Sequence, residues 1–267
     1  MIKQAIIKLL GKFGYQLVKI KSVSPQEVLA HKERGLRIIQ TISPDFSVLQ
    51  GPFEGLKYPH IDITEATLVP KIAGSYESQL NNIVEEIIKK GYSNIIDVGC
   101  AEGYYAVGFA KRMPATTIHA YDINKKDLEF CSLMAKENGV SNIRFGSFCS
   151  PQTLLDFVSA GRTLVFCDAE GYELELFTPE VISKLRNTDI LVELHDTVNP
   201  QLSTILKSRF VNTHRIEIVN NRQTDLTRFF PKLAKLNADD KLYAVMEHRG
   251  GYNENCFMEW AYLTALQ

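Results

Sequence analysis

The chain has 267 residues, of which 45% are hydrophobic and 23% are charged, as in ordinary globular proteins and unlike disordered or fibrous ones. Its formal net charge of −1 gives no overall field that would attract nucleic acid or an anionic membrane, so we expect no nucleic-acid partner. The five cysteines lack the spacing of a disulfide framework or a zinc site. Because we also find neither a signal peptide nor an apolar run of the roughly 20 residues needed to span a bilayer, we expect a cytoplasmic protein.

The first 74 residues are predicted to form a helical and irregular arm. Residues 1–13 have apolar side chains at helical spacing with lysines between them, which favours a helix packed on the main domain. The alternative is an interfacial helix that makes peripheral contact with a membrane or a partner. Residues 41–70 are rich in proline, glycine and aromatics, which indicates irregular structure.

Residues 75–267 read as one domain in which helices and strands alternate, with a polar and irregular insertion at about 220–256. This alternation predicts an α/β, Rossmann-like fold with a mostly parallel seven-stranded sheet and helices on both faces. A last apolar run, 257–263, is expected to add an antiparallel strand. The other expected strands are 94–98, 117–121, 143–146, 163–167, 189–194 and 213–219, and the expected helices are 76–90, 103–112, 125–138, 152–159, 172–186 and 200–208.

A glycine-rich turn follows the first strand of this domain. The spacing Gly99-x-x-x-Gly103 differs from the Gly-x-Gly-x-x-Gly fingerprint of dinucleotide sites, and Asp97 and Glu102 would repel a pyrophosphate. These carboxylates suit S-adenosylmethionine, which carries an ammonium and a sulfonium group. Asp122 ends the next strand, where a carboxylate can accept hydrogen bonds from ribose hydroxyls. The third strand is followed by Ser147, a candidate contact of the adenine.

Acidic residues and a histidine follow the fourth and fifth strands. Asp168 and Glu170 lie after one strand, and Glu193 and His195 end the next, so all four are expected to converge at the edge of the sheet that holds the glycine turn. We expect His195, supported by Asp168 or Glu170, to act as a general base toward a hydroxyl acceptor. The alternative, a divalent cation held by the same cluster, is the less favoured interpretation. Glu173 and Glu175 are interpreted as a solvated helix start.

The motifs Asp168-Ala-Glu-Gly-Tyr-Glu173 and Glu193-Leu-His195 resemble those of FkbM-type methyltransferases, over roughly residues 75–200. The segment Gly74-Ser-Tyr-Glu77 is also similar to the part of that family that often contacts the methionine portion of the cofactor. The resemblance implies a class I methyltransferase fold and O-methylation of a hydroxyl, often on sugars or natural products. The expected cofactor contacts are Tyr76, Glu77, Asp97, Gly99, Ala101, Glu102, Gly103, Tyr104, Asp122, Ile123, Ser147 and Asp168.

Three other classes of protein fit the sequence less well. A nicotinamide oxidoreductase would need a third glycine in the turn and a catalytic Lys, Tyr or Ser dyad. An amino-methylating nucleic-acid enzyme often has Asn/Asp-Pro-Pro-Tyr/Phe where this chain has Asp168-Ala-Glu-Gly171. A non-catalytic cofactor-binding module would not need the acidic cluster. We therefore expect a small-molecule or glycan acceptor, while the oligomeric state stays open. Candidate contacts of the acceptor are Arg249, Tyr252, Glu259 and Trp260, although an aromatic side chain in this part of the chain more often belongs to the core.

Overall fold

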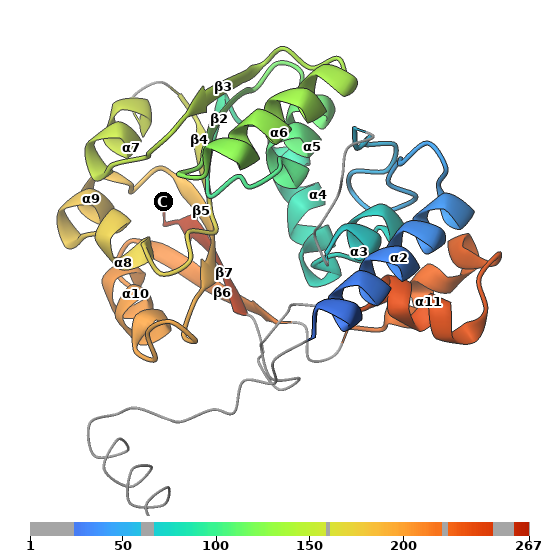
Figure 1. The fold of residues 1–267 in the computed structure, drawn as a ribbon. Helices are drawn as coiled ribbons and strands as arrows, with labels where there is room; N and C mark the ends of the chain where they lie inside the picture. Colours follow the sequence, from blue (N-terminus) through green and yellow to red (C-terminus); the bar gives the residue numbers. More distant parts are fainter. Residues whose placement is uncertain (1–23, 60–66, 159–160, 221–223, 248–258, 267) are drawn as a thin grey trace, which may run out of the picture.

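The computed structural model describes residues 24–59, 67–158, 161–220, 224–247 and 259–266. Seven strands form one sheet in the order β3-β2-β1-β4-β5-β7-β6 (Figure 1). The strands are β1 (Asn94–Val98), β2 (Thr117–Tyr121), β3 (Ile143–Gly146), β4 (Thr163–Cys167), β5 (Asp189–Leu194), β6 (His214–Asn220) and β7 (Glu259–Ala265). The six strands expected from 94 to 219 are thus confirmed to within one residue, and the last strand is shifted by two residues.

The sheet is parallel from β3 to β5 and antiparallel where β7 pairs with β5 and β6. Its central strands β4 and β5 are buried along their whole length, because helices cover both faces. In each of the edge strands β3 and β6, only the first residue is buried, and the other residues are partly or fully exposed. This strand order, with its one reversed strand, is that of the class I methyltransferase fold, as the sequence predicts.

Helices cover the sheet on both sides (Figure 1). The predicted helix over 172–186 is two short helices in the structure, because Thr178 caps a new helix start and Pro179 occupies its first turn. One face carries α4 (Asn81–Lys90), α5 (Tyr104–Arg112) and α6 (Lys125–Glu137), and the other carries α7 (Pro151–Val158), α8 (Glu173–Leu176), α9 (Pro179–Lys184) and α10 (Leu202–Phe210).

The described part of the N-terminal arm packs on the α4–α6 side of the sheet (Figure 1). It contains a helix that the sequence analysis did not predict, α2 (Pro25–Ile42), which Ser24 and Glu27 start with a capping box. It continues through α3 (Leu68–Ala73) to the short helix η1 (Ser78–Leu80). Phe53 from the arm packs edge-on against Phe109 of α5, with 5.4 Å between ring centroids, so the arm shares the core of the main domain. The helix expected at residues 1–13 lies outside the described residues.

The insertion after β6 is helical where the structure describes it, which corrects the expectation of irregular structure. It holds η2 (Leu226–Leu233) and α11 (Ala238–Val245). Asp240 at the start of α11 accepts hydrogen bonds from Arg34 at 2.9 Å and from Arg37 at 3.0 Å, both on α2. The insertion therefore fastens to the N-terminal arm. Within the described ranges, every helix is too short or too polar to cross a membrane.

Candidate active site

A pocket of about 260 Å³ opens at the carboxyl ends of the parallel strands. In open α/β sheets, ligands bind where the strand order reverses, which here is between β1 and β4. Six of the residues predicted for the site line this pocket: Gly99, Asp122, Ile123, Ser147, Asp168 and Glu170. The rest of its lining comes from Val98, Tyr121, Phe148, Cys149, Ala169 and Tyr172.

The glycine turn is held against the end of β4 and tied to the end of β2. Gly99 has a φ of +86°, and a Cβ at this position would lie 1.7 Å from the backbone oxygen of Asp168, so only glycine fits. The backbone N–H of Ala101 donates to Oδ2 of Asp122 at 2.9 Å, and the N–H of Asn124 donates to Oδ1 at 2.7 Å. Asp122 therefore fixes the turn beside the pocket, and each oxygen keeps further acceptor capacity.

Asp97 is fully buried at the end of β1 and does not line the pocket. Both of its carboxylate oxygens lack a hydrogen-bond partner among the described residues. Burial, together with the charges of Asp168, Asp122 and Glu102, raises the pKa of the Asp97 carboxyl well above its usual range. A buried carboxyl without a partner is costly, which is expected where a cationic ligand group completes the site.

Two other acids predicted to bind the cofactor have protein partners in the structure. The buried carboxylate of Glu102 accepts hydrogen bonds from Lys71 and from the hydroxyl of Tyr58. The carboxylate of Glu77 accepts a hydrogen bond from the Tyr105 hydroxyl at 2.6 Å. Glu77 also has a left-handed backbone, with a φ of 43°, and its N–H donates to Glu247 of the insertion at 2.8 Å.

The remaining predicted cofactor contacts, Tyr76, Gly103 and Tyr104, lie on the arm side of the turn. The rings of Tyr76 and Tyr104 pack edge-on at 5.4 Å, and the ammonium of Lys71 lies 4.8 Å from the centre of the Tyr76 ring. Gly103 starts α5 with a φ of +103°. These residues stand outside the lining of the pocket.

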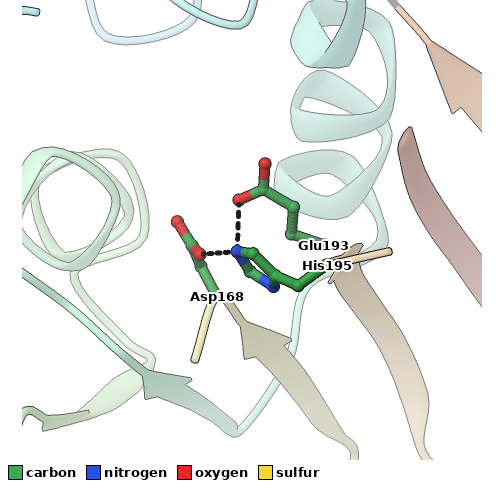
Figure 2. A group of neighbouring side chains, drawn as sticks. All are labelled: Asp168, Glu193 and His195. Atoms are coloured by element: carbon green, nitrogen blue, oxygen red, sulfur yellow. Dashed lines mark ion pairs between the residues drawn. The ribbon is translucent and has the colours of Figure 1, made fainter. Parts of the chain in front are cut away.

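His195 lies at the centre of four carboxylates. Its Nδ1 atom is 2.7 Å from Oε1 of Glu173, and its Nε2 atom is 3.3 Å from Asp168 and 3.6 Å from both Glu170 and Glu193. Figure 2 shows Asp168 and Glu193 approaching the same ring nitrogen from two neighbouring strand ends. The convergence predicted for the ends of β4 and β5 is thus present, and Asp168 belongs both to this cluster and to the pocket.

The carboxylates determine the protonation of His195. Burial lowers its pKa, but interactions with Asp168 and Glu173 outweigh burial and raise the pKa to about 10. At neutral pH the ring therefore carries a proton on each nitrogen and has no lone pair with which to accept another. The role of general base expected from the sequence stays a prediction. It requires that the His195 ring first lose one of its two protons.

Glu173 differs from its interpretation as a solvated residue, and Trp260 follows the more common role of an aromatic side chain in the core. Glu173 is fully buried and holds His195, whereas Glu175, its companion in the motif, is exposed as expected. The buried side chain of Trp260 packs against Phe166, with 5.1 Å between ring centroids, so it belongs to the core. Arg249 and Tyr252 lie outside the described residues.

Comparisons with known proteins agree with the class that the fold defines. Residues 89–148 match a family model described as a methyltransferase domain. A curated relative, the ribosomal RNA small subunit methyltransferase C of Shewanella piezotolerans, is 29% identical over 98 residues, which cover 37% of this chain and 29% of the relative. The match thus spans less than a third of the relative's length. Together with the strand order, these findings support a class I S-adenosylmethionine-dependent methyltransferase. The narrower resemblance to FkbM-type enzymes rests on the sequence motifs alone.

Similar solved structures include an rRNA methylase from Streptococcus thermophilus and a protein described as StiE O-MT. The methylase is 10% identical, covers 69% of this chain and 95% of its own, and superposes with a TM-score of 0.46. StiE O-MT is 14% identical, covers 89% of this chain and 90% of its own, and has a TM-score of 0.45. Likenesses at this level carry no argument about the acceptor.

Proposed function

We propose that the protein transfers the methyl group of S-adenosylmethionine to a hydroxyl on a sugar, a glycan or a natural product. The observation that carries this proposal is the position of Asp168. Its side chain lines the pocket at the switch point of the sheet and lies 3.3 Å from the buried His195. The cofactor pocket and the acid–histidine cluster therefore adjoin, as a methyl donor and an acceptor must.

The pocket offers distinct surroundings to the parts of the cofactor. We expect the ribose hydroxyls to donate to Asp122, whose carboxylate faces the pocket at the end of β2. Ile123 and Phe148 are large apolar residues that line the pocket and are 84% and 52% exposed, and we expect them to pack on the adenine. Asp97 lies outside this lining, at the end of the strand that leads into the glycine turn, and its carboxyl has no hydrogen-bond partner among the described residues. We expect the ammonium group of the cofactor to be its partner.

The reaction would be an in-line displacement. A lone pair of the acceptor oxygen forms a bond to the methyl carbon while the carbon–sulfur bond breaks, and the electron pair of the broken bond passes to sulfur and neutralises the sulfonium. The acceptor's proton leaves to a base or to water. Positioning of the two reactants supplies most of the rate in such a transfer, with electrostatic stabilisation of the changing charges as the second contribution.

Calorimetry with S-adenosylhomocysteine tests the cofactor assignment. Asp122→Ala is expected to weaken binding at least tenfold, about 1.4 kcal/mol, because it removes the ribose acceptor and frees the glycine turn. Glu129→Ala, an exposed acid on α6, serves as the control and should bind as the wild type does. Unchanged affinity in Asp122→Ala would disprove the ribose assignment.

The acceptor class is tested with S-adenosylmethionine that carries a labelled methyl group. Sugars and glycosides with free hydroxyls form one arm, and purified ribosomal RNA forms the other, because the curated relative is named as a ribosomal RNA enzyme. We expect label in an alkali-stable ether of the sugar arm. Transfer only to RNA would overturn the hydroxyl proposal for small acceptors, and binding without any turnover would favour a non-catalytic cofactor-binding module.

A further inference from the structure

We propose that Asp168, Glu193 and His195 form a binding site for a divalent cation, with Mn²⁺ as the best-matched ion. From the sequence alone, a cation site is less favoured than a general base at this cluster. The arrangement of the side chains in the structure favours the cation site. Binding of the cation is a property of the chain itself. It is measurable without cofactor or acceptor.

The distances suit a small coordination sphere. One ligand atom from each of the three residues lies within 4.8 Å of the others, and Nε2 of His195 is 3.3 Å and 3.6 Å from the two carboxylates. Ligands about 2.1 Å from an octahedral ion are roughly 3 Å apart when adjacent and 4.2 Å apart when opposite. The three side chains therefore need only a small contraction to surround an ion.

His195 is oriented as a metal ligand. Its side chain is 1% exposed, and its Nε2 atom makes no hydrogen bond of good geometry with the described residues. On the other side of the ring, Nδ1 lies 2.7 Å from the buried carboxylate of Glu173, which also accepts from the N–H of Ala169 at 3.2 Å. A carboxylate that holds one ring nitrogen while the other faces two acids is the usual support of a metal-bound histidine.

The charge of the cluster also favours a cation. Asp168, Glu173 and Glu193 surround one histidine, and the side chains of Glu173 and Glu193 are at most 1% exposed. Even with a protonated ring, these four side chains by themselves carry a net charge of −2, and charge held away from water is expensive. A divalent ion that displaces the Nε2 proton to solvent reduces this net charge to −1.

The ligand set indicates which ion to expect. Carboxylates favour Mg²⁺ and Mn²⁺, whereas imidazole favours transition metals, so Mn²⁺ suits two carboxylates with one imidazole best. Asp168 faces the pocket, so open coordination positions would point toward it. A hydroxyl bound there would lose its proton more readily. This last consequence rests on the proposed function, but the cation site does not.

Electron paramagnetic resonance of Mn²⁺ measures the site directly, because protein-bound ions lose the sharp signal of the free ion. The full chain is stripped with EDTA, dialysed and titrated with Mn²⁺. We expect one bound ion in the wild type, loss of binding in His195→Ala, and at least a tenfold weaker affinity in Glu193→Gln. Glu173→Gln should weaken binding by about 10–100-fold through the orientation of His195.

Glu175→Gln is the matched control, since Glu175 belongs to the same short helix but is exposed, and it should bind as the wild type does. Circular dichroism checks the fold of each variant, and the near-isosteric Glu193→Gln keeps the test valid if His195→Ala fails to fold. The proposal is overturned if the wild type leaves Mn²⁺ free at about 1 mM, or if folded Glu193→Gln binds it as tightly as the wild type. Failure of methyl transfer with intact Mn²⁺ binding would count against the proposed function and leave the cation site standing.

Discussion

Oε1 of Glu173 lies 2.7 Å from Nδ1 of His195, and both side chains are buried. The contact joins the short helix α8 to the end of β5, across 22 residues of sequence. It fixes the orientation of the imidazole ring and directs Nε2 toward Asp168 and Glu193 (Figure 2). The chemistry available to His195 therefore depends on a residue that does not line the pocket.

Glu173→Gln is expected to lower the pKa of His195 from about 10 in the metal-free chain. The substitution removes one of the two negative charges that raise this pKa, while burial continues to lower it. Nitrogen-15 NMR of the imidazole ring, recorded against pH with EDTA present, measures the change. In Glu175→Gln the pKa should stay where it is, and an equal pKa in wild type and Glu173→Gln would refute the assigned role of Glu173.

Asp97→Asn is expected to keep or raise the stability of the fold while it weakens cofactor binding. The raised pKa of Asp97 means that the folded state holds its proton more tightly than the unfolded state, so the wild type loses stability as pH rises above about 3.9. The amide does not ionise, so the variant should match or exceed the wild type in urea unfolding, more so at pH 7 than at pH 4.

The same variant should bind S-adenosylhomocysteine at least tenfold more weakly, because the amide cannot neutralise the ammonium group. Calorimetry beside the unfolding measurement checks both halves of the prediction. A variant that is less stable than the wild type yet binds the ligand normally would show that Asp97 has a structural role.

Gly99→Ala should destabilise the fold through two separable effects. A left-handed alanine costs about 1–2 kcal/mol, and contact of its Cβ with the backbone of Asp168 adds a clash, so we expect a loss of about 2–5 kcal/mol. Gly139→Ala isolates the first effect, since Gly139 has a φ of +66° and its Cβ would meet no atom within 4 Å. Urea unfolding of both variants tests this, and equal losses would mean that the close approach of the turn to β4 is unimportant.

Asp240→Asn should loosen the contact between α2 and α11. Hydrogen bonds from Arg37 and Arg34 lower the pKa of Asp240, so their contribution is present above the unfolded value near 3.9 and is lost as pH falls through the folded value. We expect the variant to melt about 1–3 °C lower at pH 7, with a smaller difference at pH 3. Asp239→Asn, an exposed neighbour, should melt as the wild type does.

The strands and the glycine turn were predictable because each depends on local patterns. Buried parallel strands give short apolar runs, and the turn needs glycine where Gly99 has a positive φ and touches the next strand end. The break at Pro179 was also visible in the sequence, but a continuous apolar pattern hid it. The helix at Ala238–Val245 begins with Asn237 and two aspartates, an N-terminal signal that the sequence analysis passed over.

The burial and the hydrogen-bond partners of individual acidic residues were not predictable, because they depend on residues that are distant in the sequence. An acid at a helix start is usually solvated, and only the fold brings His195 to Glu173 and makes that residue a buried partner. In the same way, only the fold places Lys71 of α3 beside Glu102, a predicted cofactor contact. Sequence periodicity gives the edge of the sheet where such groups gather, but it does not give the pairs they form.

The antiparallel strand β7 lies between β5 and β6, although β6 precedes it in the chain. On the ribosome, β6 therefore emerges before the strand that joins it to the rest of the sheet. During this interval the outer side of β5 and the backbone of β6 are unpaired, and exposed strand edges of this kind invite association with other chains. Pairing of residues 259–265 closes both edges in one step, so the sheet is completed only after this segment has left the ribosome.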